Sequence, residues 1–150
     1  MKTNFHSGFA TAGAAGEATA KSTIELISAQ AHADTPADQS VLGIPNDADP
    51  RTLALSGVQR IDLHFPKFSD GRAFSQAFLL RRRLGFRGEI RATGDVLVDQ
   101  LVQMQRTGFD SAVLREDQDV GVAQRQFERY NAFYQGDAVT AAPHFARGIA

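Results

Sequence analysis

The chain has 150 residues, a formal net charge of −1 and no cysteine. This length fits one domain with a genuine core. The near-zero charge gives no overall attraction to nucleic acid or to an anionic membrane. No apolar run approaches the roughly 20 residues that cross a bilayer. The absence of cysteine excludes disulfides, thiolate nucleophiles and Cys-ligated zinc or iron–sulfur centres held by this chain alone, so any redox centre must belong to a partner or to a cofactor that the sequence does not identify.

The first 40 residues are predicted to be mostly disordered. Residues 1–22 are rich in Ala, Gly and Thr, which bury little area, and they lack the continuous apolar core of a secretory signal. Residence in the cytoplasm is therefore the default expectation. The apolar patch at residues 24–27 fits either a marginal strand or a loosely docked segment, and the polar residues 31–39 indicate a linker.

Residues 41–136 are predicted to form one domain of four βα units, followed by a loose tail at 137–150. Strands are expected at 41–44, 61–65, 89–93 and 111–114, because these runs are apolar or alternate apolar with polar residues. Helices are expected near 51–56, from Asp70 to about Leu84, from Asp95 past Met104, and up to about Tyr134. Strands that alternate with helices imply a parallel sheet, and hence the α/β class.

Polar residues occupy one face of two of these strands. Asp62 and His64 share a face of one strand, and Glu89, Arg91 and Thr93 share a face of another. A strand covered by helices on both sides should be almost wholly apolar. The pattern therefore favours helices on one side only, as in a half-barrel, with an open sheet as the alternative. A polar face left exposed would also favour a homodimer or a docked partner.

The loop after the second strand is a candidate anion site. Lys67 and Arg72 flank Asp70 and Gly71 at a predicted helix start, where unpaired N–H groups and the helix dipole favour negative charge. The simpler interpretation is that Asp70 caps the helix, Gly71 permits the turn and the two cations are solvated.

The next strand-to-helix turn carries Gly94 and Asp95. Asp95 is a candidate general base or cation ligand, or simply a helix cap, and Asp99 and Gln100 lie one turn farther along. His64 and Arg91 complete a candidate catalytic set with Asp95. The alternative for the polar strand residues is a structural lattice of ion pairs. The histidines show no metal-ligand spacing, so no metal site is predicted.

Five arginines cluster in the middle of the chain, at positions 81, 82, 83, 87 and 91. Arginines late in a helix satisfy its dipole, which is one explanation. The other is a docking surface for an acidic partner such as a ferredoxin-like electron carrier. Nucleic acid is disfavoured, because the aromatic residues fall at core spacing.

Residues 65–110 also resemble a known family. The stretch reads FPKFSDGRAFSQAFLLRRRLGFRGEIRATGDVLVDQLVQMQRTGFD and contains the motifs FPKF-DGR, GE-RA-GD and DQL-M-R-GFD. In combination these motifs resemble the bacterial domain of unknown function 934 family, and the resemblance extends over about residues 41–135. The resemblance implies a small cytoplasmic protein of sulfur assimilation, described as a probable oxidoreductase involved in sulfite reduction. The family often has a cysteine where this chain has Thr107, so a thiol there is not required. The pattern falls on Phe65, Pro66, Lys67, Asp70, Gly71, Arg72, Ser75, Arg91, Gly94, Asp95, Asp99 and Gln100.

Three hypotheses follow. The first is an accessory protein of assimilatory sulfite reduction that binds sulfite reductase or its electron carrier, and a small oxyanion through Lys67 and Arg72. The second is a small-molecule enzyme, an oxidoreductase or lyase-like protein, with Asp95, Arg91 and His64 at the strand ends. The third is a structural adaptor without catalysis.

Overall fold

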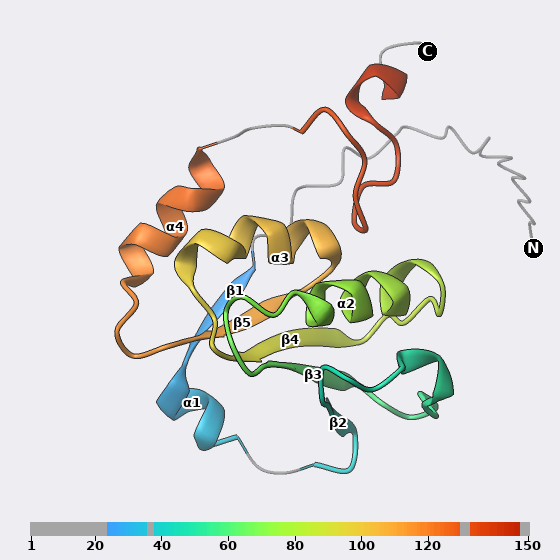
Figure 1. Cartoon of the computed structure of the whole chain (residues 1–150), viewed down its shortest axis with the longest axis vertical. Coiled ribbons are helices and arrows are strands. Elements are labelled where there is room, and N and C mark those ends of the chain that lie inside the picture. Colours follow the sequence, from blue (N-terminus) through green and yellow to red (C-terminus); the bar gives the residue numbers. More distant parts are fainter. Residues whose placement is uncertain (1–23, 36–37, 130–132, 148–150) are drawn as a thin grey trace, which may run out of the picture.

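The computed structural model describes residues 24–35, 38–129 and 133–147. The segment that the sequence predicts to be mobile, residues 1–22, lies outside these residues. The described part is an open sheet of five parallel strands in the order β1-β5-β4-β3-β2, with helices between the strands (Figure 1). The α/β class and the parallel sheet are confirmed, and the sheet does not close into a barrel.

The four strands predicted from the sequence are all present. They are β2 (Val41–Ile44), β3 (Arg60–Phe65), β4 (Glu89–Gly94) and β5 (Ser111–Leu114). The helices that follow them are shorter than the sequence predicts. They are η1 (Pro50–Thr52), α2 (Arg72–Arg82), η2 (Val98–Gln100), α3 (Leu101–Thr107) and α4 (Val120–Glu128), with a last turn η3 (His144–Arg147).

A fifth strand lies upstream of the predicted domain boundary at residue 41. β1 (Glu25–Ser28) pairs with β5 along its whole length, and the Glu25 N–H donates to the Asp110 carbonyl at 2.9 Å. Helix α1 (Ala29–Ala33) follows where the sequence indicates a linker, and it is capped by the Ser28 hydroxyl. A four-residue strand receives its hydrogen bonds from a partner more than 80 residues away, so its own sequence carries a weak signal.

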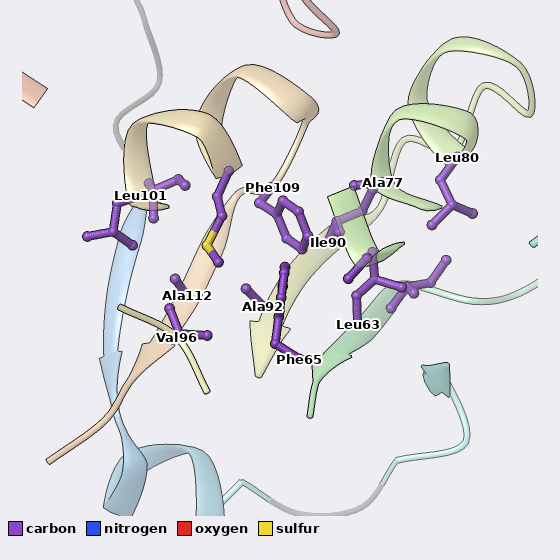
Figure 2. Packing of buried hydrophobic residues seen from close by; sticks show 14 of the residues in the cluster. Leu63, Phe65, Ala77, Leu80, Ile90, Ala92, Val96, Leu101, Phe109 and Ala112 are labelled. Carbon is purple, nitrogen blue, oxygen red and sulfur yellow. The ribbon is translucent and has the colours of Figure 1, made fainter. Parts of the chain in front are cut away.

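The apolar face of the sheet is covered by α2 and α3, which lie side by side (Figure 1). Leu63, Phe65, Ile90, Ala92 and Ala112 point from the strands toward these helices (Figure 2). Ala77 and Leu80 of α2, with Leu101 of α3, close the core from above. The sequence favours helices on one side only. This expectation holds for α2 and α3 but not for α1, which lies on the other side.

The opposite face is polar, and α1 lies on that side. The Nδ1 atom of His32 in α1 is 3.3 Å from the guanidinium of Arg91. Arg91 points away from the core face, because its neighbours Ile90 and Ala92 belong to the core cluster. The connection from β1 to β2 therefore passes on the polar side of the sheet.

Two helix starts differ from the predicted caps. The N-cap of α2 is Gly71 without a side-chain bond, while Asp70 accepts from the Arg72 N–H at 3.2 Å. The turn η2 starts after Leu97, and Asp95 bonds elsewhere. At the other end of α3, Gly108 ends the helix with φ of 108°, a left-handed conformation that favours glycine.

Arg81 is separate from the other clustered arginines. Its guanidinium donates to the carbonyls of Gly108 (2.9 Å), Phe86 (2.9 Å) and Gly88 (2.7 Å), and it pairs with the Asp110 carboxylate. A Cβ on Gly108 would lie 2.5 Å from Arg81 Cγ, so only glycine at this position leaves room for the Arg81 side chain. Of the five clustered arginines, Arg81 is therefore bound within the domain and is not available to a docked partner.

The segment predicted as a loose tail contacts α3. The Ala138 N–H donates to the Arg106 carbonyl at 2.9 Å, and the Arg106 side chain reaches the Asp137 carboxylate at 3.5 Å. Arg106 also stacks 4.3 Å from the Phe133 ring centroid. One arginine of α3 thus joins residues 133–138 to the domain.

We predict that Arg81→Met lowers the free energy of unfolding by about 2–4 kcal/mol, because three carbonyls and a carboxylate lose their donor. Arg82→Met, at the neighbouring exposed position, should change it by less than about 0.5 kcal/mol. Urea denaturation of both variants measures the difference. Equal effects of the two substitutions would contradict a structural role for Arg81.

Candidate functional site

At the carboxyl edge of the sheet, the loop after β3 is held by residues that follow β4. The Asp95 carboxylate accepts from the Phe68 N–H at 2.8 Å, and the Gln100 side-chain amide donates to the Phe68 carbonyl at 2.6 Å. The backbone of Phe68 is therefore bound on both sides, while its ring is 52% exposed. Asp95 and Gln100 position this loop.

The second oxygen of Asp95 faces Arg115. Arg115 Nη1 lies 2.6 Å from Asp95, and its Nη2 lies 2.6 Å from Asp117. The hydrogen bond from Arg115, with the one from the Phe68 N–H, lowers the pKa of Asp95 below its ordinary value of 3.8. A carboxylate with a lowered pKa is a weak base at neutral pH, so this environment suits an ion pair better than proton abstraction.

The predicted anion site has a different arrangement of charges. Asp70 binds the Arg72 guanidinium at 2.7 Å and accepts from the Asn46 amide at 2.6 Å. The hydrogen bonds from Arg72 lower the pKa of Asp70 to about 2. Lys67 is exposed and belongs to no ion pair in the part of the chain that the structure describes. Of the two predicted cations, one is therefore already paired with a carboxylate.

The other candidate site residues from the sequence lie on β3, at the end of β4 or in the segments that follow these strands. Gly94 has φ of 91°, and a Cβ there would collide with the Phe65 carbonyl and lie 2.7 Å from His64 Cε1. His64 is exposed on the polar face, with Nδ1 3.5 Å from the Thr93 hydroxyl. Gly71, Ser75 and Asp99 are exposed as well.

The polar face of the sheet carries two separate ion-pair groups. Arg91 is almost buried, and its guanidinium binds Glu89 at 2.8 Å and the Ser111 hydroxyl at 3.2 Å, in addition to His32. Arg60 pairs with Asp62 at 2.9 Å along the same strand. The register nevertheless places Arg60 opposite Glu89 and Asp62 opposite Arg91, and the charge of Arg60 helps to lower the pKa of Glu89. Within the described residues, no hydrogen bond joins the two ion pairs, and none joins His64 to either of them.

Glu89 is a partly buried carboxylate of this face. Burial by itself would raise the pKa of Glu89, but hydrogen bonds from Ser111 (2.5 Å) and Arg91 outweigh burial and leave the pKa lowered. The group is ionised and paired, which is the property of a structural lattice.

With this geometry established, comparison with known proteins assigns the chain to a family. A family model described as "Bacterial protein of unknown function (DUF934)" matches residues 41–145. The chain belongs to the DUF934 family. No curated protein and no solved structure matches this DUF934 chain.

Two further observations concern ligands and membranes. Within residues 24–35, 38–129 and 133–147, no three His, Cys, Asp or Glu side chains of the DUF934 protein lie close enough together to hold a metal ion. Over the same described residues, none of the helices combines the length and apolar character needed to cross a bilayer.

The sequence analysis did not identify several residues that bind Asp95 and Arg91. Arg115, which follows β5, binds both Asp95 and Asp117. His32 and Ser111 are further partners of Arg91. The sequence did contain a signal for Arg115 and Asp117, the run of charged and polar residues 115–119 directly after β5. Because the carboxyl ends of parallel strands meet at one edge of a sheet, this run must lie near the residues that follow β4.

We predict that Asp95→Ala frees the loop after β3, so that the Phe68 amide exchanges hydrogen faster. Asp117→Ala removes a carboxylate from the same guanidinium but leaves the Phe68 contact, and it is the matched control. Since the pKa of Asp95 is lowered in the folded state, its contribution to stability is full at about pH 7 and is lost as pH falls below the ordinary carboxyl value. Hydrogen exchange and urea denaturation over that pH range measure both effects. Equal exchange rates in the two variants would refute the assignment of Asp95 as the residue that holds the loop.

Proposed function

We propose that this DUF934 protein is an accessory protein of assimilatory sulfite reduction that docks an acidic partner, either sulfite reductase or its ferredoxin-like electron carrier. The resemblance to the family supports the process. The observation that carries the docking role is an arginine surface formed by Arg82, Arg83 and Arg87, which are exposed and belong to no ion pair within the described residues.

The arginine surface has the composition of a protein–protein interface. It lies at the end of α2 and in the segment before β4. Phe78 and Leu84 are 42% and 38% exposed, and Phe78 lies one helical turn before Arg82 on the same face. Aromatic and apolar residues beside arginines are typical of the residues that contribute most to binding energy.

The acids at the carboxyl edge support a binding role over catalysis. Asp95 is paired with Arg115 and Asp70 with Arg72, and the pKa of each carboxyl is lowered by its guanidinium. A general base works best with a pKa near the operating pH. The two paired carboxylates, Asp70 and Asp95, therefore do not favour the alternative of a small-molecule enzyme.

The homodimer has less support than the docked partner. The polar face that favours it in the sequence is partly occupied by α1, and its arginines pair with acids of the same face.

The second part of the proposal is a small oxyanion at Lys67. Lys67 is exposed beside the first turn of α2, and Arg72 is the second cation of that corner. An anion must compete with Asp70 for Arg72, because that carboxylate occupies the guanidinium at 2.7 Å. The oxyanion proposal therefore requires weak binding that depends on both cations.

For the docking role, we predict that Arg82→Glu with Arg83→Glu weakens binding to the acidic partner by about 10-fold or more, since each like-charge contact opposes association. The matched control is Arg125→Glu with Arg129→Glu, which makes the same change of charge at exposed positions at the far end of α4. Binding to purified sulfite reductase and to the carrier, measured over a range of salt concentrations, compares the variants. Equal loss in both pairs would reject the arginine surface.

A growth experiment distinguishes a role in sulfite reduction from the role of a structural adaptor in another process. A strain that lacks the gene should grow on cysteine but poorly on sulfate and sulfite as the sulfur source, and the wild-type gene should restore growth. Normal growth on sulfate would contradict a role in sulfite reduction.

For the oxyanion, we predict that sulfite or sulfate raises the melting temperature, and that Lys67→Ala reduces this rise. Asp70→Asn releases the Arg72 guanidinium, so it should increase the rise beyond that of the wild type. An unchanged rise in Lys67→Ala, or no increase in Asp70→Asn, would contradict oxyanion binding at this corner.

A further inference from the structure

The carboxyl ends of β1 and β5 lie next to each other, and the chain leaves them toward opposite sides of the sheet. After β1, α1 lies on the polar side, where His32 reaches Arg91. After β5, α4 packs against α3 on the apolar side (Figure 1). In open parallel sheets, this divergence of two adjacent connections marks the crevice where ligands bind.

A cavity of about 260 Å³ lies in this crevice. Leu26 and Ile27 of β1, Leu114 of β5 and Val120 of α4 form its apolar wall, and Glu116 and Gln118 are among its polar lining residues. Leu114 is 4% exposed and Val120 is 51% exposed, so the cavity extends from the core to the surface. It is smaller than the pockets that hold drug-sized ligands, and it suits a single ring.

Two charged residues line the cavity, Arg115 and Glu116. The guanidinium of Arg115 is already shared by Asp95 and Asp117 at 2.6 Å each, so it is not available to an anion. Glu116 is exposed and belongs to no ion pair in the described part of the chain. An unpaired carboxylate at the mouth of an apolar cavity favours a cation.

We propose that this cavity binds a small molecule with an apolar or aromatic body and a protonated amine, the body against Leu114 and Val120 at the carboxyl ends of β1 and β5 and the amine at Glu116. This site is separate from the arginine surface, which lies at the end of α2, and from the Lys67 corner, and it does not depend on the proposed function. Fragment-sized ligands of this kind bind with dissociation constants on the order of millimolar.

The test is an NMR titration of the full ¹⁵N-labelled chain with three ligands of similar size. Benzylamine should give saturable shifts of the amides of Ser28, Leu114 and Gln118, whereas benzyl alcohol should bind more weakly and benzoate most weakly. The proposal is overturned if benzoate binds as tightly as benzylamine, if the shifts lie elsewhere, or if benzylamine gives no saturable shift.

Two variants distinguish the contribution of the ligand's apolar body to binding from that of its amine. Val120→Trp fills the cavity from its exposed rim and should abolish the binding of benzylamine and benzyl alcohol alike. Glu116→Gln should reduce benzylamine affinity by about 3- to 10-fold and leave benzyl alcohol unchanged, because only the charge is removed. Glu128→Gln, an exposed acid at the end of α4, is the matched control. Unchanged benzylamine binding in Val120→Trp, or an equal loss in Glu116→Gln and Glu128→Gln, would also overturn the proposal.

The site and the docking role are tested independently. The Arg82→Glu, Arg83→Glu variant should bind benzylamine as the wild type does, because its changes lie at the end of α2. Loss of benzylamine binding in that variant would overturn the assignment to the β1–β5 crevice. Failure of partner docking with intact benzylamine binding would reject the proposed function and leave this site in place.

Discussion

The arrangement of this sheet depends on the hydrogen bonds of one largely buried guanidinium, that of Arg81. Arg81 joins the last turn of α2 to the turns before β4 and β5 through three carbonyls and the carboxylate of Asp110. The same carboxylate accepts from the Ile90 N–H at 2.8 Å, so the starts of β4 and β5 are held together. Because burial of a guanidinium is costly without partners, each carbonyl must be in place before the arginine is stable there. This requirement fixes where the strands begin, and hence which residues reach the carboxyl edge.

The two ends of the sheet have opposite electrostatic character. At the carboxyl edge, Asp70 and Asp95 are both ionised and bound to arginines, and the segment after β5 adds further carboxylates. Near the amino end of β4, Arg82, Arg83 and Arg87 are exposed and belong to no ion pair among the described residues. A protein with this asymmetry presents different ends to acidic and basic molecules. The docking proposal and the amine proposal use this difference, since the acidic partner is placed at one end and the small amine at the other.

Several features of the fold were predictable because their causes are local. The alternation of Ile61, Leu63 and Phe65 with polar residues identifies a strand with two unlike faces, and the structure places helices α2 and α3 on the apolar one. The glycine stop at Gly108 is equally local, since a left-handed residue ends the helix. Features that depend on distant partners were left open by the sequence. It offered a marginal strand or a loosely docked segment at residues 24–27, and pairing with β5 decides for the strand. Asp95 was offered as a helix cap, but its carboxylate binds Phe68 and Arg115 instead.

The amino-acid sequence by itself determined the α/β class, the positions of four strands along the chain, the polar face of the sheet and the edge at which polar residues gather. These follow from hydrophobic periodicity and turn chemistry, which act over a few residues. Only the tertiary structure decided which charges are free. Arg81 and Arg82 are adjacent in the chain, yet one is bound by three carbonyls and the other is exposed. The reason is physical: a charge is paired or free according to the groups that packing brings beside it, and these groups come from distant parts of the chain.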